Sequence, residues 1–392
     1  MPKGFIPTFQ IYKGSENVTA RFQDRAMSIV VELSSGAGEQ DHVEILLDDR
    51  EWLIATPRVK DRLTVYLGYE GVGVAFMGAF EINSLQFSFP PRNILVRGTA
   101  ASSLNDLKSQ MVKGFSGQTV EEILAAAGAK VGMKVDVHPS IADQRIPFLN
   151  NTASYSQLIA KLEQHYGAVA KINDGKLSLT PRGSGKSVSD LAQPTFVLRA
   201  ESFADLQVLV ESRGETASTK ASYTDKTSLE RVFVESKSKL SELETSATHT
   251  IQNLFNSKDE AQAAADSAQG QLDRSTGKIS ATLAEGDPWV RDQQRIVVTG
   301  IRDGINGSYL IDLVRHQFTK NGALRTSFSG NAGIDGLAAV YSSSGENNPS
   351  FVVLPPGTVF GQVLPKASGT ELSSPFNSVP SLIGQPLPFS IN

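Results

Sequence analysis

The sequence has no cysteine among its 392 residues. Disulfide bonds, thiolate metal sites and cysteine nucleophiles are therefore excluded, and stability must come from packing or from assembly. The sequence also lacks a dense lysine and arginine tract, since 37 basic and 41 acidic residues give a formal net charge of -4. Because proteins that hold nucleic acid carry clustered positive charge, DNA is not indicated as the main ligand.

Long apolar runs are missing as well. No uncharged stretch approaches the roughly 18 apolar residues of a membrane-spanning helix. Residues 1–9 have neither the apolar core nor the small-residue cleavage site of a secretory signal. We therefore expect the protein to be made and kept in a cytoplasm, without stable membrane insertion.

Short alternating runs predict strands in two separate parts of the chain. In the first hundred residues they indicate an antiparallel barrel or sandwich, and they cover 27–33, 42–47, 63–69, 76–87 and 93–98. They return as a second β domain at 195–198, 206–210, 220–223, 230–234, 278–283, 295–300, 309–320 and 324–329.

Between the two β parts the pattern becomes helical. Thr119 and Glu122 match a capping box at the start of a short helix, and 155–166 carries apolar residues on one face. Asp174-Gly175 predicts a tight hairpin turn. A third helix, rich in alanine, is predicted over 257–274, and its alanines form a thin face suited to lying against a sheet.

The end of the sequence has a composition of its own. Residues 349–392 hold eight of the 18 prolines and two charged residues, Lys366 and Glu371. Because a disordered tail is usually charged and poor in apolar residues, we expect this one to lie extended in a groove of a partner or, alternatively, on its own domain. The side chains predicted to face a partner are Phe351, Val353, Leu354, Phe360, Val363, Leu364, Phe376, Leu382 and Ile383.

Together these patterns predict a mainly β chain with an α+β insert. The expected parts are a first β domain (1–101), the α+β insert (102–183), a Ser/Gly-rich linker (184–194), a second β domain (195–335) that contains the 257–274 helix, and an extended tail (336–392).

Motifs for chemistry are weak. Residues 183–187 resemble the end of a phosphate-binding loop, but Thr180 stands where its first glycine belongs. Asp136 and His138 share one face of a predicted strand, and an exposed pair explains them better than a metal site. No Gly-x-Ser-x-Gly nucleophile elbow is present. We predict no catalytic, cofactor or metal residues, although two carboxylates for glycosidase chemistry could hide among the 41 acids.

The order of these segments resembles the phage late control protein D family. The resemblance covers residues 5–330 and rests on several phrases in sequence order. They are Ile45–Arg50, Leu63–Tyr69, Met77–Ile82, Ile94–Ala100, Leu107–Gln110, Thr119–Leu124, Leu158–Val169 and the helix that follows Ser257.

The resemblance implies a structural, non-enzymatic baseplate hub, similar to the N-terminal part of type VI secretion spike proteins. In such hubs each subunit holds two tube-like β barrels, and a homotrimer adapts a six-fold tail tube to a three-fold spike. The implied partners are the spike, the tail tube or its initiator, the tape-measure protein and the baseplate wedge, with DNA only passing through the lumen.

The implied location is the baseplate of a virion tail, or an extracellular contractile injection particle, assembled in the bacterial host cytoplasm. Two alternatives stay open: a hub with peptidoglycan-degrading activity, and a free β-rich protein that binds carbohydrate or peptide.

Overall fold

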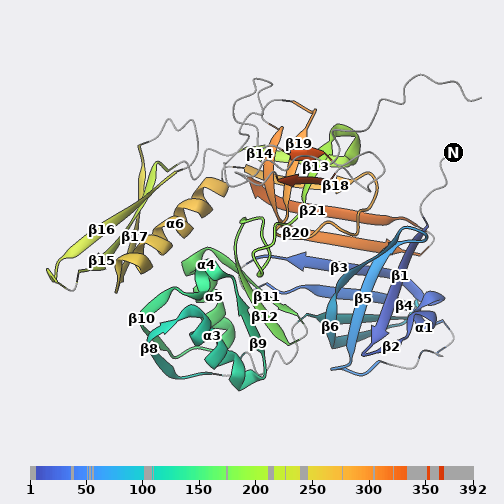
Figure 1. Ribbon diagram of the computed structural model, residues 1–392. Coiled ribbons are helices and arrows are strands. Elements are labelled where there is room, and N and C mark those ends of the chain that lie inside the picture. Colours follow the sequence, from blue (N-terminus) through green and yellow to red (C-terminus); the bar gives the residue numbers. More distant parts are fainter. Residues whose placement is uncertain are drawn as a thin grey trace, which may run out of the picture.

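A computed structural model describes most of the chain up to residue 332 and two short strands beyond it (Figure 1). The described residues are 6–36, 39–50, 52, 54, 57–100, 108, 110–173, 175–210, 216–225, 227–238, 246–275, 277–302, 305–320, 322–332, 351–353 and 362–365.

The first β region is an antiparallel sheet in which the strands follow the order β2-β1-β5-β6-β7-β4-β3. Apolar side chains alternate along each strand, so that Leu63, Val65 and Leu67 of β5 are all buried. The elements are β1 (Pro7–Lys13), β2 (Glu16–Asn17), α1 (Thr19–Gln23), β3 (Ala26–Ser34), β4 (His42–Asp48), β5 (Arg62–Tyr69), β6 (Gly73–Ser88) and β7 (Asn93–Thr99).

The insert has a hydrophobic core of its own, as the change of pattern predicts. Both predicted helix starts are confirmed, since Thr119 and Ser154 each form a complete capping box. Gly175 has a φ of 74° in the β11–β12 turn. The elements are β8 (Lys113–Thr119), α3 (Val120–Gly128), η1 (Ala129–Val131), β9 (Lys134–Val137), α4 (Pro139–Ala142), β10 (Arg145–Asn151), α5 (Tyr155–Tyr166), β11 (Ala168–Asn173) and β12 (Lys176–Pro181).

The second β region is built around one long strand, β20. One edge of β20 pairs with β19 over 307–310 and with β3 of the first β region over 313–319, while its other edge pairs with β21. The strands are β13 (Thr195–Arg199), β14 (Phe203–Val210), β18 (Gly277–Leu283), β19 (Arg295–Thr299), β20 (Gly307–Thr319) and β21 (Leu324–Ala332), with the short η2 (Ala200–Ser202) after β13.

The prediction of a mainly β chain with an α+β insert is confirmed, but the expected pair of tube-like barrels differs from the observed pairing. The described strands of the two β regions form one continuous 15-stranded sheet that does not close on itself. The reason lies in β3 and β20. Each leaves an unpaired edge in its own region, and the two edges satisfy each other's backbone groups, which joins the regions into one core.

A smaller unit projects from the rest, at the left of Figure 1. Strands predicted at 220–223 and 230–234 lie here in a separate three-stranded sheet with the order β16-β15-β17. Ala261 and Ala265 of the helix are fully buried against this sheet, which confirms the predicted thin alanine face. The elements are β15 (Ser218–Thr224), β16 (Arg231–Lys237), β17 (Thr248–Phe255) and α6 (Lys258–Arg274).

Two short strands beyond residue 332 are described, β22 (Phe351–Val353) and β23 (Gln362–Pro365). β23 pairs antiparallel with β13 at the edge of the second β region. Among the described residues, no helix is long and apolar enough to span a membrane.

Candidate functional site

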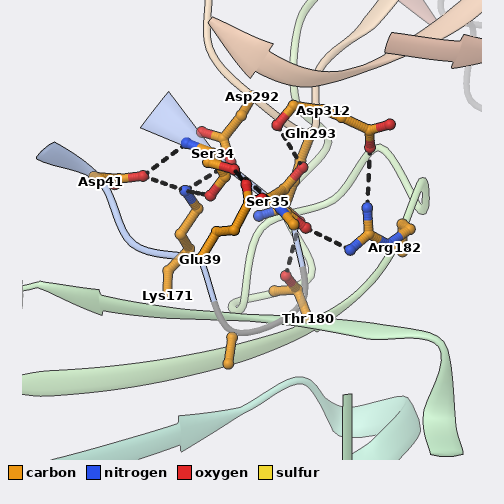
Figure 2. Close-up of polar contacts among 12 residues, drawn as sticks. Ser34, Ser35, Glu39, Asp41, Lys171, Thr180, Arg182, Asp292, Gln293 and Asp312 are labelled. Carbon is orange, nitrogen blue, oxygen red and sulfur yellow. Dashed lines mark hydrogen bonds and ion pairs between the residues drawn. The ribbon is translucent and has the colours of Figure 1, made fainter. Parts of the chain in front are cut away.

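Charged and polar side chains gather where the first β region, the insert and the second β region meet (Figure 2). We call this cluster the polar junction. Segments far apart in the sequence bring its members together, namely the end of β3 and the loop after it, strands β11 and β12, the loop before β19, and the middle of β20. Its members are Ser34, Ser35, Glu39, Asp41, Lys171, Thr180, Arg182, Asp292, Gln293 and Asp312.

Lys171 of β11 ties the insert to both β regions. Its ammonium lies 2.6 Å from Asp41 Oδ1 and 2.8 Å from Asp292 Oδ2, and it donates a hydrogen bond to the Ser34 carbonyl. Burial lowers the pKa of Lys171, but the carboxylates of Asp292 and Asp41 outweigh burial and hold the pKa above its ordinary value. Lys171 is therefore a fixed cation.

Arg182, which follows β12, makes the second connection. Its guanidinium lies 2.9 Å from Asp312 Oδ1 and also donates to the Ser35 carbonyl. The Ser35 hydroxyl in turn donates to the Asp312 carbonyl at 3.0 Å. Burial raises the pKa of Asp312, and the two neighbouring arginines, Arg182 and Arg274, act against that rise.

Asp312 occupies a special point of β20. The register between β20 and β21 shifts between Ile311 and Leu313, where the opposite edge of β20 changes partner from β19 to β3. Such a bulge leaves the groups of one residue outside the regular ladder. The Ser35 amide and hydroxyl satisfy the freed Asp312 carbonyl, at 2.8 and 3.0 Å.

The polar junction therefore fixes how the insert sits on the two β regions. The Thr180 hydroxyl, which donates to Gln293 Oε1 at 3.2 Å, adds a neutral contact to the two ionic ones. Lys171 and Arg182 are thus paired with Asp41, Asp292 and Asp312, and these ion pairs position the insert.

The residues weighed for a metal are not brought together. Asp136 pairs with Lys176, whereas the His138 ring faces Asp190 at 3.1 Å and Ser140 at 2.9 Å. Within the described ranges, no group of three or more histidine and acidic side chains could hold a metal ion.

The segment that resembles a phosphate-binding loop is a turn-rich loop. Lys186, which would contact phosphate in such a motif, pairs with Asp190 at 2.8 Å, and the chain then continues to strand β13.

The predicted partner-facing residues of the tail are only partly described. Phe351 and Val353 lie in β22, and Val363 and Leu364 lie in β23. Val363 is paired with Thr195 of β13 through the backbone. The other predicted residues, Leu354, Phe360, Phe376, Leu382 and Ile383, lie outside the described residues.

An exposed aromatic cluster was not predicted from the sequence. Trp52 and Phe89 are 62% and 68% exposed, and their ring centroids lie 6.1 Å apart. The Arg92 guanidinium lies over both rings, at 5.0 and 5.5 Å from their centroids. Tryptophan and arginine are enriched among the residues that dominate protein interfaces. The only sequence signal is a tryptophan in a polar turn.

Comparison with known proteins gives a consistent result. No protein-family model matches the sequence. The chain is 21% identical over 353 residues to the "Probable baseplate hub protein" of Escherichia phage 186, which covers 81% of this chain and 90% of that protein. It is 24% identical over 184 residues to the protein of the same description in Escherichia phage P2, which covers 47% of each.

Among solved structures, the 43 kDa tail protein of prophage MuSo2 from Shewanella oneidensis superposes with a TM-score of 0.60. The match covers 85% of this chain and 100% of that one, at 14% sequence identity. The fold is thus that of phage tail proteins. More particularly, the chain is a homologue of the baseplate hub proteins of phages 186 and P2, which confirms the resemblance expected from the sequence.

Proposed function

We propose that this protein is the structural hub of a contractile phage-like tail and forms a trimeric ring that adapts the six-fold tail tube to the three-fold spike. The observation that carries the proposal is the match to the phage 186 protein, because it extends over 90% of that protein's length. A match of this extent is longer than either β region or the insert, so it is more than one shared module.

The architecture supports such an adaptor in two ways. Each chain holds two β regions joined by the β3–β20 pairing, so three chains would supply six β regions around a ring. The polar junction fixes the insert against both β regions. In a ring of three chains, the six β regions would therefore keep a constant arrangement relative to one another.

Strand β14 supports assembly through its edge. Among the described strands it pairs only with β18, which leaves one side of an eight-residue strand open. Leu209 of β14 is 51% exposed. A long open edge is an aggregation hazard for a free protein, and pairing with a neighbouring subunit would remove the hazard.

The C-terminal tail is proposed to secure the assembly. Its apolar, proline-rich composition favours extended docking on the spike or on the adjacent subunit, with Phe360, Phe376 and Leu382 among the contacting side chains. The tail tube or its initiator, the tape-measure protein and the baseplate wedge are the other proposed partners. The proposed location is the tail baseplate of a virion or related injection particle.

Mass measurement tests the ring directly. At micromolar concentration, alone or with its spike, the protein should form trimers that show three-fold rings by electron microscopy. A stable monomer that never associates with the spike would contradict the hub proposal. Deletion of residues 345–392 should weaken spike binding or ring assembly, and an unchanged behaviour in both would contradict the role of the tail.

A charge placed on the β14 edge tests the proposed subunit contact. Leu209→Lys should reduce trimer formation, since an ammonium would have to lose its water at the interface. Leu191→Lys is the matched control, because Leu191 is 68% exposed and lies in the loop before β13. Equal trimer formation by Leu209→Lys and Leu191→Lys would exclude β14 from the interface.

The proposed role is structural rather than enzymatic, as the description of the homologues favours. Glycosidase chemistry needs a carboxyl with a raised pKa that can reach substrate. Burial raises the pKa of Asp287 to about 7, but this side chain is 1% exposed and accepts a hydrogen bond from the Trp289 amide. Turnover of purified peptidoglycan by the wild-type protein, abolished by a single Asp or Glu substitution, would overturn the structural reading.

A further inference from the structure

An open groove of about 1120 Å³ lies beside the polar junction. Its walls come from the end of β3, helix α5, the C-terminal half of α6, and strands β20 and β21. The groove is lined mainly by polar side chains, among them Lys161, Gln164, Ser267, Gln271, Arg274 and Asn331.

The carboxylates that line this groove are committed to internal contacts. Glu163 accepts a hydrogen bond from the Ala170 amide at 2.7 Å, and Glu39 accepts one from the Ser34 hydroxyl. Asp312 is paired with Arg182 at 2.9 Å. Each of these carboxylates therefore already accepts a hydrogen bond from within the protein, and Asp312 is also paired with a cation.

Two cations of the same groove have no direct partner among the described residues, although Arg274 lies within the electrostatic influence of Asp312 and Asp273. Within the described part of the chain, Arg274 in the last turn of α6 makes no hydrogen bond or ion pair through its guanidinium, and Lys161 on α5 makes none through its ammonium. Arg274 is half-buried, and burial together with the like charge of Arg182 lowers its pKa to about 10, against the opposing effect of Asp312 and Asp273. A partly buried guanidinium whose donors are unpaired is destabilising, so an acceptor from another molecule would be favoured there.

We propose that this groove binds an acidic peptide segment of a partner protein, with a carboxylate of the peptide paired to Arg274 and a second one near Lys161. Arginine pairs with carboxylates through two parallel hydrogen bonds, which gives orientation as well as attraction. The side chains of Gln164 and Gln271 offer both donors and acceptors along the groove, as a peptide backbone requires.

A peptide fits the groove better than a compact anion does. A phosphate site needs several donors that converge on one point, whereas Arg274 and Lys161 lie on two different helices, α6 and α5. This inference goes beyond the hub proposal and does not depend on ring formation, since all the groove residues belong to one chain.

The test uses the full chain and a fluorescein-labelled hexaglutamate peptide, with hexaglutamine as the uncharged control, in a fluorescence anisotropy titration. The wild-type protein should bind hexaglutamate and not hexaglutamine. Arg274→Gln should weaken binding roughly tenfold or more, as expected for a lost charge-assisted pair, and Lys161→Gln should weaken it several-fold.

Matched variants make the result specific. Arg325→Gln removes an exposed arginine of β21 that does not line the groove, and it should leave the affinity unchanged. Arg274→Lys keeps the positive charge without the planar fork, so it should bind with intermediate affinity, and it serves as the second variant if Arg274→Gln fails to fold.

Three results would overturn the proposal. They are an unchanged affinity in Arg274→Gln, a loss in Arg325→Gln as large as in Arg274→Gln, and equal binding of hexaglutamine and hexaglutamate. Tighter binding of a ten-residue thymidine oligonucleotide than of hexaglutamate, if lost in Arg274→Gln, would overturn the choice of a peptide as the occupant.

Discussion

Replacing Lys171 with methionine tests whether the polar junction holds the insert in place. Methionine keeps an unbranched chain of similar volume and removes the ammonium. In the wild-type protein that ammonium lies 2.6 Å from Asp41 Oδ1 and 2.8 Å from Asp292 Oδ2, and the Asp292 side chain is 9% exposed. The variant would leave two carboxylates facing each other in a poorly hydrated site.

The expected loss of stability follows from this burial. Breaking a fully buried ion pair by removing one partner costs about 3–5 kcal/mol, whereas an exposed pair is worth about 0–1 kcal/mol. The Lys171 side chain is 21% exposed, so solvent screens part of the interaction. We expect Lys171→Met to lower the free energy of unfolding by about 2–4 kcal/mol at pH 7.5.

The loss should depend on pH. Burial raises the pKa of Asp292, and the charge of Lys171 acts against that rise, so Lys171→Met should raise the pKa of Asp292 further. A carboxyl whose pKa is higher in the folded than in the unfolded state contributes stability below its unfolded pKa, and this stability is lost as pH rises through the folded pKa. The deficit of Lys171→Met relative to wild type should therefore be smaller at pH 5 than at pH 7.5.

Urea unfolding followed by circular dichroism at pH 5, 6 and 7.5 measures this deficit. Lys176→Met is the matched control, because Lys176 pairs with Asp136 at the surface, where the two side chains are 51% and 43% exposed, respectively. This variant should lower the free energy of unfolding by less than about 1 kcal/mol. Adding Asp292→Asn to Lys171→Met should recover part of the loss. Equal losses for Lys171→Met and Lys176→Met, or a loss independent of pH, would refute the reasoning.

Three further predictions concern single sites. Burial raises the pKa of Asp287 to about 7, so the wild-type protein should lose stability as pH rises from about 4 through 7. Asp287→Asn should flatten this dependence when thermal midpoints are compared at pH 5.5 and 8. Parallel pH profiles of the two proteins would contradict the prediction. Ala265→Leu should lower the free energy of unfolding in urea by about 1–3 kcal/mol, because Ala265 is fully buried against β15. Ala263→Leu, at a half-buried position of the same helix, should cost less. The reverse order would argue against tight packing of α6. Thr119→Ala should lower the free energy of unfolding by about 1 kcal/mol and speed amide exchange at the start of α3, whereas Thr119→Ser should remain close to wild type. Equal stability of Thr119→Ala and the wild-type protein would show that the capping box contributes nothing.

Local features were predictable from the sequence because their causes are local. The capping box at Thr119 and Glu122 marks the start of α3, since the bonds that define it join residues three positions apart. The turn at Gly175 and the alanine face of α6 follow from residue types at fixed spacing. Composition and alternation were likewise enough for the mainly β class.

The joining of the two β regions could not be predicted in this way. Leu33 of β3 pairs with Val314 of β20, and alternation along either strand does not identify its partner. The polar junction has the same origin. Lys171, Asp41 and Asp292 meet only after three distant segments have folded, so no spacing in the sequence marks them. The presence of Trp52 in the sequence also did not predict the exposed aromatic cluster, because a tryptophan is more often buried than exposed.

The shared strand β20 has a mechanical consequence. Seven residue pairs join it to β3, from Leu313 to Thr319, and together with the Ser35–Asp312 and Lys320–Met27 hydrogen bonds they link the backbones of the two β regions. A pull along the strand direction would load these hydrogen bonds together rather than one after another. Force that enters one β region would pass into the other through backbone, with the side chains around Asp312 bracing the point where the strand changes partners.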